Sequence, residues 1–184
     1  MSTAPPTGRR GLLIGALFAI AVAVVVVDQV TKQIAIAVLE GRPSVPVIGE
    51  LAGFTFYRNP GAAFGMGANS TWIFAVIAII VLVGILVASR RLGSRAWSWG
   101  LGLLLGGLTG NLIDRLFRPP GFFHGAVVDF IDLSLFICNV ADIAISAAAV
   151  VIVVTTLRGI GLDGTRDSDE TQTASAEDAA KEQV

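Results

Sequence analysis

Asp129 and Asp142 are the residues whose type and setting best suit acid–base chemistry. Asp129 lies in the stretch 127–132, and Asp142 lies at the start of a long apolar segment. A carboxylate at the centre of a membrane helix costs roughly 2.5–3.5 kcal/mol on insertion scales, so it needs a partner or a function. Two carboxylates held close together do not both ionise easily, so one can serve as an acid while the other activates water. We therefore interpret the two aspartates as a pair that shares a proton.

Two further sets of polar residues occur at helical spacings. Asp28 and Lys32 stand four residues apart, so they share one helix face and can either form an ion pair or mark a charged helix end. Asn111, Asp114 and Arg115 also share a face, and Asp114 is a second candidate for membership of the acid–base pair. Its neighbour Arg115 should keep Asp114 ionised, which suits a structural acceptor better than an acid that exchanges protons.

Two asparagines complete the set of candidate residues. Asn59 precedes Pro60 and Gly61, a combination that is typical of a turn. Taken alone, this asparagine is more often a turn former than a ligand group. Asn139 opens the same apolar segment as Asp142. If the apolar segments cross a membrane, all these polar residues come to one boundary of it, and this convergence indicates a functional site.

The composition places the chain in a bilayer. Hydrophobic residues make up 54% of it and charged residues 15%, whereas soluble domains contain about 25% charged residues. No basic stripe with interleaved aromatic residues is present, so binding to nucleic acid is not expected. The single cysteine, Cys138, cannot form an internal disulfide, and no Cys/His cluster has zinc spacing. We expect neither a metal nor another cofactor.

Four apolar segments are long enough to span a membrane, at about 11–27 (continuing to 32), 72–88, 97–116 and 139–157. The first is too long for a cleavable signal peptide. Short strands are expected at 45–48 and 54–57, and residues 116–135 are expected to form a loop. The predicted fold class is an all-α polytopic membrane protein with four transmembrane helices and a small extracytoplasmic β-sheet or loop region. Residues 11–157 form its domain, between a disordered N-terminus (1–10) and a disordered acidic tail (158–184).

Two patterns orient and pack these segments. Gly102, Gly106 and Gly110 lie on one stripe of the third segment, which allows another helix to approach closely. The basic residues near the segment ends fall on one side of the membrane, which predicts that both termini are cytoplasmic. These residues are Arg9, Arg10, Arg90, Arg91, Arg95 and Arg158. The candidate site then lies near the outer face.

Two functions from other classes compete with hydrolysis. An ion or proton transporter could use the same carboxylates, but it would more often place them near the middle of the bilayer within repeats. Asp and Asn oxygens could also bind a divalent cation. An aspartic hydrolase fits the clustering at one boundary best.

Five stretches of the chain, in register, resemble the motifs of bacterial lipoprotein signal peptidase (signal peptidase II). They are Asp28-Gln-Val-Thr-Lys32, Arg58-Asn59-Pro-Gly-Ala-Ala-Phe-Gly65, Gly106-Gly-Leu-Thr-Gly-Asn111-Leu-Ile-Asp114-Arg115, Val127-Val-Asp129-Phe-Ile-Asp132 and Asn139-Val-Ala-Asp142. The resemblance covers residues 12–157, with Cys138 and Thr109 as small departures beside the motifs.

This resemblance implies an intramembrane aspartic endopeptidase of the bacterial inner membrane. It would cleave diacylglyceryl-modified prolipoproteins before the lipidated cysteine, without a metal, and would be inhibited by globomycin. Asp129 and Asp142 would be the catalytic pair. Its supporting residues would be Asp28, Lys32, Asn59, Asn111, Asp114, Arg115 and Asn139. We expect a monomer surrounded by membrane lipid.

Overall fold

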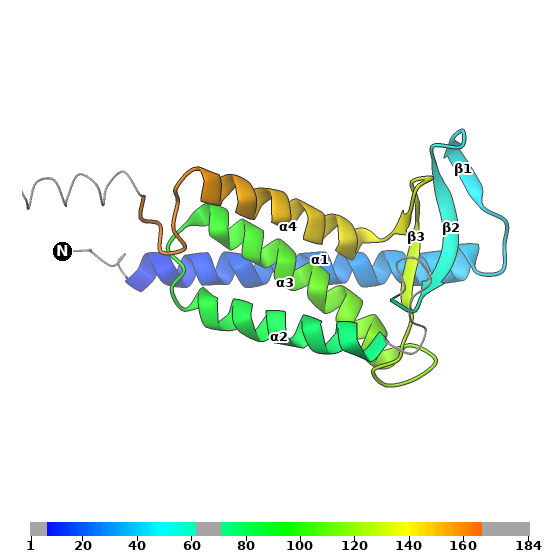
Figure 1. Cartoon of the computed structure of the whole chain (residues 1–184), viewed down its shortest axis with the longest axis horizontal. Helices are drawn as coiled ribbons and strands as arrows, with labels where there is room; N and C mark the ends of the chain where they lie inside the picture. The colour runs from blue at the N-terminus through cyan, green and yellow to red at the C-terminus, as the bar shows by residue number, and fades with distance from the viewer. Residues whose placement is uncertain (1–6, 62–70, 167–184) are drawn as a thin grey trace, which may run out of the picture.

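The structure is a computed structural model, and it describes residues 7–61 and 71–166. The second half of the motif 58–65 and the tail beyond 166 lie outside these residues. Helices form an elongated bundle, and a small sheet lies at one end of it (Figure 1). In chain order the elements are α1 (Thr7–Leu39), β1 (Val45–Ile48), β2 (Ala52–Asn59), α2 (Thr71–Ser89), α3 (Arg95–Phe117), β3 (Val127–Asp132), β4 (Ile137–Cys138) and α4 (Val140–Leu157).

Three of the four expected membrane-crossing helices are confirmed by length and composition. These are α1, α2 and α4, whose outward surfaces carry exposed apolar side chains such as Val26, Ile80 and Val150. The fourth, α3, is long enough but less apolar, because it contains many glycines and several polar residues. It contacts each of the other three helices, so much of its surface faces protein (Figure 1). A helix in that position does not need a fully apolar surface.

The sheet has four antiparallel strands in the order β1-β2-β3-β4. The expected strands in 45–57 and the expected small sheet beside the helices are confirmed, but the expectation of a loop over 116–135 is wrong, because β3 lies within this range. Asp129 is therefore a strand residue, opposite Tyr57 of β2, and Asn59 is opposite Val127. The strand was not predicted because it contains two aspartates, and aspartate is depleted in strands.

The glycine stripe of α3 packs on α1, as expected. A Cβ added to Gly106 would lie 2.7 Å from Cβ of Val24 and 2.8 Å from the carbonyl oxygen of Ala21. A Cβ on Gly110 would lie 2.5 Å from Oδ2 of Asp28. Nothing larger than glycine therefore fits along this contact, and the stripe brings the polar end of α1 against α3.

Residues 7–10 and 158–166, which were expected to be disordered, belong to the folded structure. α1 starts at Thr7, so residues 7–10 are helical. At the other end, residues 158–166 fold against the start of α3: Trp97 Nε1 donates to the carbonyl oxygen of Ile160 at 2.8 Å, and Gly93 N donates to that of Leu162 at 2.9 Å. The side chain of Leu162 also packs against the apolar core, which a sequence rich in acids did not indicate.

Gly106→Val should destabilise the bundle, because its branched side chain would enter the backbone of α1. Overpacking of this kind costs about 1–3 kcal/mol, so we expect a melting temperature several degrees lower in a thermal unfolding assay in detergent. Gly84→Val on α2 is the matched control, since nothing lies within 4 Å of a Cβ at that position. Equal losses for both variants would contradict close α1–α3 packing as the cause.

Candidate active site

Asp129 and Asp142 come from different elements and meet at Asn139. The backbone N–H of Asn139 donates to Oδ2 of Asp142 at 3.1 Å, and its side-chain Nδ2 donates to Oδ1 of Asp129 at 2.6 Å. Asn139 is the N-cap residue of α4, and its Oδ1 accepts from the backbone N–H of Asp142 at 3.0 Å. The reciprocal cap fixes Asp142 at the helix start, where the helix dipole favours a negative charge.

Two more asparagines donate to the aspartates. Asn59 Nδ2 lies 2.8 Å from Oδ2 of Asp129, so β2 supplies a donor to the neighbouring strand. Asn111 Nδ2, from α3, lies 2.8 Å from Oδ1 of Asp142. Each aspartate therefore accepts two N–H groups. Asn59 also closes its turn, since Oδ1 accepts from Gly61 N at 2.9 Å, and the turn and ligand interpretations of this residue both hold.

The two aspartates have different environments. Asp129 is 1% exposed, whereas Asp142 is half-buried. Burial and, to a smaller extent, the negative charge of Asp142 raise the pKa of Asp129 to about 6, against the opposing effect of the donors Asn59 and Asn139. Burial and the same two carboxylates raise the pKa of Cys138 to about 11, so this thiol stays neutral and is a poor nucleophile. Acid–base chemistry at this site therefore centres on the aspartates.

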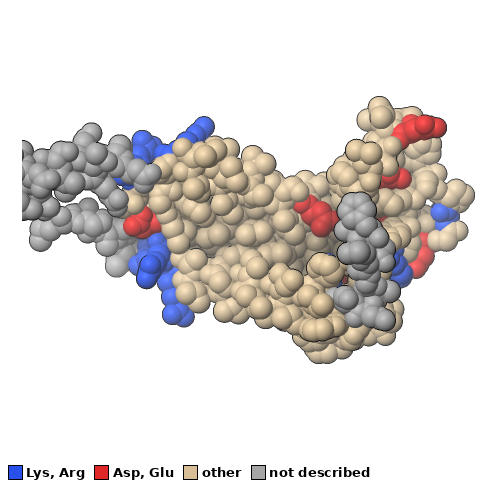
Figure 2. Space-filling model, in the orientation of Figure 1, with Lys and Arg blue, Asp and Glu red and all other residues tan. Residues whose placement is uncertain are grey.

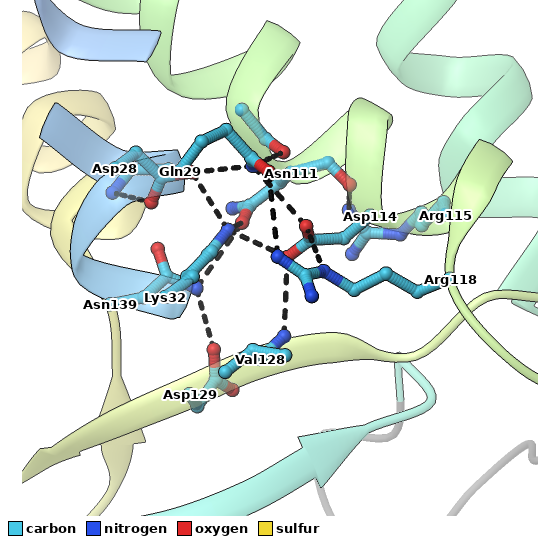
Figure 3. Close-up of polar contacts among 12 residues, drawn as sticks. Asp28, Gln29, Lys32, Asn111, Asp114, Arg115, Arg118, Val128, Asp129 and Asn139 are labelled. Atoms are coloured by element: carbon cyan, nitrogen blue, oxygen red, sulfur yellow. Dashed lines mark hydrogen bonds and ion pairs between the residues drawn. The ribbon is translucent and has the colours of Figure 1, made fainter. Parts of the chain in front are cut away.

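Beside the aspartates lies a buried ion cluster of Asp28, Lys32, Asp114 and Arg118 (Figure 3). The expected pair of Asp28 with Lys32 is confirmed, with Nζ 2.9 Å from Oδ2 of Asp28 and 2.8 Å from Oδ2 of Asp114. Arg118 Nε lies 2.6 Å from Oδ1 of Asp114. The cluster holds two positive and two negative groups, so its charges balance, as buried charges require.

The ion cluster also binds the backbone next to each aspartate. Oδ2 of Asp114 accepts from the N–H of Val128 at 3.2 Å, and Oδ1 of Asp28 accepts from the N–H of Ala141 at 3.0 Å. Val128 directly precedes Asp129, and Ala141 directly precedes Asp142. The cluster thus positions strand β3 and helix α4 relative to α1 and α3.

Arg115, the neighbour expected to act on Asp114, forms no ion pair with it in the described structure. Lys32 and Arg118 occupy the Asp114 carboxylate instead, and Arg115 Nη1 donates to the backbone oxygen of Asn111 at 3.1 Å. The Arg115 guanidinium lies 5.7 Å from the ring centre of Phe74. On a helix, adjacent residues point about 100° apart, whereas Arg118 stands at i+4 from Asp114 and can reach it.

Arg118 and Gln29 belong to the site but were not among the residues predicted from the sequence. Gln29 Nε2 donates to Oδ2 of Asp28 at 3.1 Å, to Oδ1 of Asp114 at 3.2 Å and to the carbonyl oxygen of Gly110 at 3.1 Å. The i+4 spacing from Asp114 could have identified Arg118, but no spacing rule points to Gln29, whose partners lie on another helix. With these two additions, all nine predicted site residues lie in one hydrogen-bonded network.

Comparison with known proteins identifies the family. The model of the family described as "Signal peptidase (SPase) II" matches residues 20–158. The chain belongs to the signal peptidase II family. The matched range includes every residue of the network described above.

Named relatives in the signal peptidase II family align over most of the chain. The lipoprotein signal peptidase of Leifsonia xyli subsp. xyli is 46% identical over 167 residues, which cover 88% of this chain and 77% of that protein. The lipoprotein signal peptidase of Rhodococcus jostii is 45% identical over 168 residues, 90% of this chain and 83% of that protein. A solved structure of a bacterial membrane enzyme superposes with a TM-score of 0.67 at 32% identity, covering 78% of this chain and 94% of the other.

The oxygen-rich site raises the question of a metal ion. Within residues 7–61 and 71–166, no three His, Cys, Asp or Glu side chains lie close enough together to hold one. The Asp28 and Asp114 carboxylates already bind Lys32 and Arg118. That the enzyme works without a metal stays a prediction, which a chelator tests.

Stability between about pH 4 and pH 6 should depend on Asp129. The pKa of Asp129 is about 6 in the folded chain, against an ordinary value of 3.8, so the folded state holds a proton that the unfolded state has released. The stabilisation is fully present below about pH 4 and is lost as the pH rises through about 6. We expect the melting temperature of the wild-type chain to fall across this window relative to Asp129→Asn, which stays neutral. Parallel pH curves for the two proteins in detergent would contradict the raised pKa.

Proposed function

We propose that this chain is a lipoprotein signal peptidase in which Asp129 and Asp142 form the catalytic pair. The observation that carries the proposal is their shared partner Asn139, which donates to one carboxylate from its side chain and to the other from its backbone. The named relatives support prolipoproteins as the substrates. We infer that the substrate carries a diacylglyceryl group on the cysteine that follows the cleaved bond.

The unequal surroundings of the pair support a division of roles. Each carboxylate accepts two N–H groups, so the two differ in burial: Asp142 is half-buried and can reach water, which makes it the base that activates water. Asp129 is buried, its pKa is raised to about 6, and it is the acid that protonates the carbonyl oxygen of the scissile bond.

With these roles, every proton that is transferred in one catalytic cycle is accounted for. Water attacks the carbonyl carbon, Asp142 takes a proton from the water, and Asp129 gives its proton to the oxygen. When the tetrahedral intermediate collapses, the leaving nitrogen takes the proton from Asp142, and Asp129 recovers one from a hydroxyl of the intermediate. The products are a carboxylic acid and a free amine, and the pair returns to its starting state.

The remaining predicted residues support the pair. Asn59, Asn111 and Asn139 orient the two carboxylates by donating to them. Asp28, Lys32 and Asp114 hold α1, α3, α4 and β3 together at this end of the bundle, and Arg115 supports Asn111 from the same helix. Both aspartates come from one chain, which supports a monomer as the active species.

The apolar helices and the family make this a multi-pass protein of the bacterial inner membrane. We infer four crossings, with α3 as the fourth. Basic side chains gather at the end of the bundle opposite the sheet, where both described ends of the chain also lie (Figures 1 and 2). Because arginine and lysine favour the cytoplasmic side, this distribution supports cytoplasmic termini and an active site near the outer face.

Asp129→Asn and Asp142→Asn should each abolish cleavage of a diacylglyceryl-modified prolipoprotein by the purified protein. Loss of the acid or the base removes at least about 100-fold of the rate, and an enzyme built on the pair loses nearly all of it. Asp132→Asn, in the same strand as Asp129, is the matched control and should keep normal activity, because its carboxylate accepts only from the nearby Ser134 N in the described structure. Substantial cleavage by either folded pair variant would refute the assigned catalytic pair.

Chelation and inhibition distinguish the aspartic mechanism from its rivals. Cleavage should continue in EDTA, since the proposed chemistry needs only the aspartates and water, and it should stop with globomycin, as the family resemblance implies. Loss of activity in EDTA that added divalent metal restores would instead establish a metal-dependent enzyme. If a demonstrably folded sample does not cleave at all, ion flux in vesicles becomes the next measurement.

A further inference from the structure

The Lys32 ammonium has an acceptor for each of its three N–H groups. Besides the two carboxylates of the ion cluster, Nζ lies 2.9 Å from Oδ1 of Asn111, and the whole side chain is 0% exposed. An ammonium donates and never accepts. Only the oxygen of the Asn111 amide can therefore face Lys32 (Figure 3).

This contact fixes the direction of the Asn111 amide. With its oxygen held by Lys32, the NH2 group points the other way and reaches Oδ1 of Asp142 at 2.8 Å. A flipped amide would place N–H groups against the ammonium and oxygen against the carboxylate, so both contacts would become repulsive. The two ends of an asparagine amide are ordinarily hard to tell apart, but here a positive group on one side and a negative group on the other determine the choice.

The orientation of the Asn139 side-chain amide is fixed in the same way. Its Oδ1 is occupied by the backbone N–H of Asp142, so its NH2 group faces Oδ1 of Asn111 at 3.2 Å and Oδ1 of Asp129 at 2.6 Å. Lys32 thus fixes the orientation of the Asn111 amide, and the backbone N–H of Asp142 fixes that of the Asn139 amide. Each amide then presents an N–H group to one of the aspartates.

We propose that Lys32 is a positioning residue that acts through Asn111 to keep an N–H donor on Asp142 and so makes Asp142 the base of the pair. The inference rests on the proposed catalytic pair and deepens it. A donor aimed at a carboxylate oxygen favours the ionised form. Asp129 also accepts two N–H groups but is the more buried of the two carboxylates, so the proton of the pair is left to Asp129 as long as Asp142 keeps the Asn111 donor. The acid and base roles are then set before substrate binds, which is a form of electrostatic preorganisation.

Other charged and titratable groups surround the pair, and the test has to separate Lys32 from them. From α1 come Asp28 and Lys32, from α3 Asp114 and Arg115, from the end of α3 Arg118, and from β4 Cys138. Among these, Lys32 is the cation that both neutralises Asp114 and donates to the side chain of Asn111. Arg118 shares the first property but not the second.

Lys32→Met and Arg118→Met therefore form a matched pair of variants. Each removes one cation from Asp114, but only the first releases the Asn111 amide. We expect Lys32→Met to lower kcat about 100-fold, as misplacement of a catalytic group by about 1 Å does, with KM within twofold of wild type. The acidic limb of its kcat profile should move up by about one pH unit, since the ionised base loses its donor. Arg118→Met should lose thermal stability and keep the wild-type pH profile.

Two further variants keep the test decisive if Lys32→Met does not fold. Asp28→Asn/Lys32→Met removes one buried charge of each sign and leaves Asp114 paired with Arg118, so it should fold and give the same shifted profile. Asn111→Ala removes the amide while leaving both ion pairs of Lys32 in place. It should reproduce the loss in kcat, and combining it with the Lys32 change should add little, because both act through one contact.

The inference is overturned if Asn111→Ala keeps the wild-type kcat and pH profile, if the losses from Lys32 and Asn111 multiply, or if Arg118→Met shifts the profile as much as Lys32→Met. Its failure is distinct from failure of the proposed function. If Asp129→Asn and Asp142→Asn are inactive while the Lys32 and Asn111 variants behave as wild type, the catalytic pair stands and only the positioning role is wrong. If the aspartate variants are active, both are wrong.

Discussion

The buried ammonium of Lys32 is the interaction on which the rest of the structure depends. Moving an ammonium out of water costs several kcal/mol even after the protein relaxes, and the cost is recovered only with good geometry and a partner for every hydrogen. Asp28, Asp114 and Asn111 meet this requirement at 2.8–2.9 Å. Since these acceptors come from both α1 and α3, the charge can be buried only if the two helices are correctly docked.

Docking in turn depends on the glycines of α3. A side chain at Gly110 would collide with the carboxylate of Asp28. Glycine at this position therefore allows both the close approach of the two helices and the ion pair of Asp28 with Lys32. The central position of α3 follows from this. A helix that carries glycines, an asparagine, an aspartate and arginines is poorly suited to lipid, but it is well suited to a place where other helices cover it.

Much of this arrangement could be predicted from the sequence, and the exceptions have physical causes. The bounds of α2, α3 and α4, the pair of Asp28 with Lys32 and the glycine contact follow from local periodicity, which a single sequence displays, whereas α1 extends past the predicted end at 32 to Leu39. Strand β3 was not predicted, because its pairing with β2 is a long-range event and its two aspartates are of a type depleted in strands. The partner of Asp114 was also missed, since Lys32 reaches it from another helix and competes with any neighbour on α3.

The same cluster connects folding to the proposed chemistry through the backbone. Asp114 holds the N–H of Val128, one residue before Asp129, and Asp28 holds the N–H of Ala141, one residue before Asp142. Strand β3 and helix α4 are unrelated elements, yet each is fixed next to its aspartate by a carboxylate that Lys32 neutralises. The positions of the two aspartates are therefore set by charges that the proposed proton transfer does not use. In the proposed mechanism, Asp129 and Asp142 can change their protonation state while the ion cluster holds the strand and the helix that carry them.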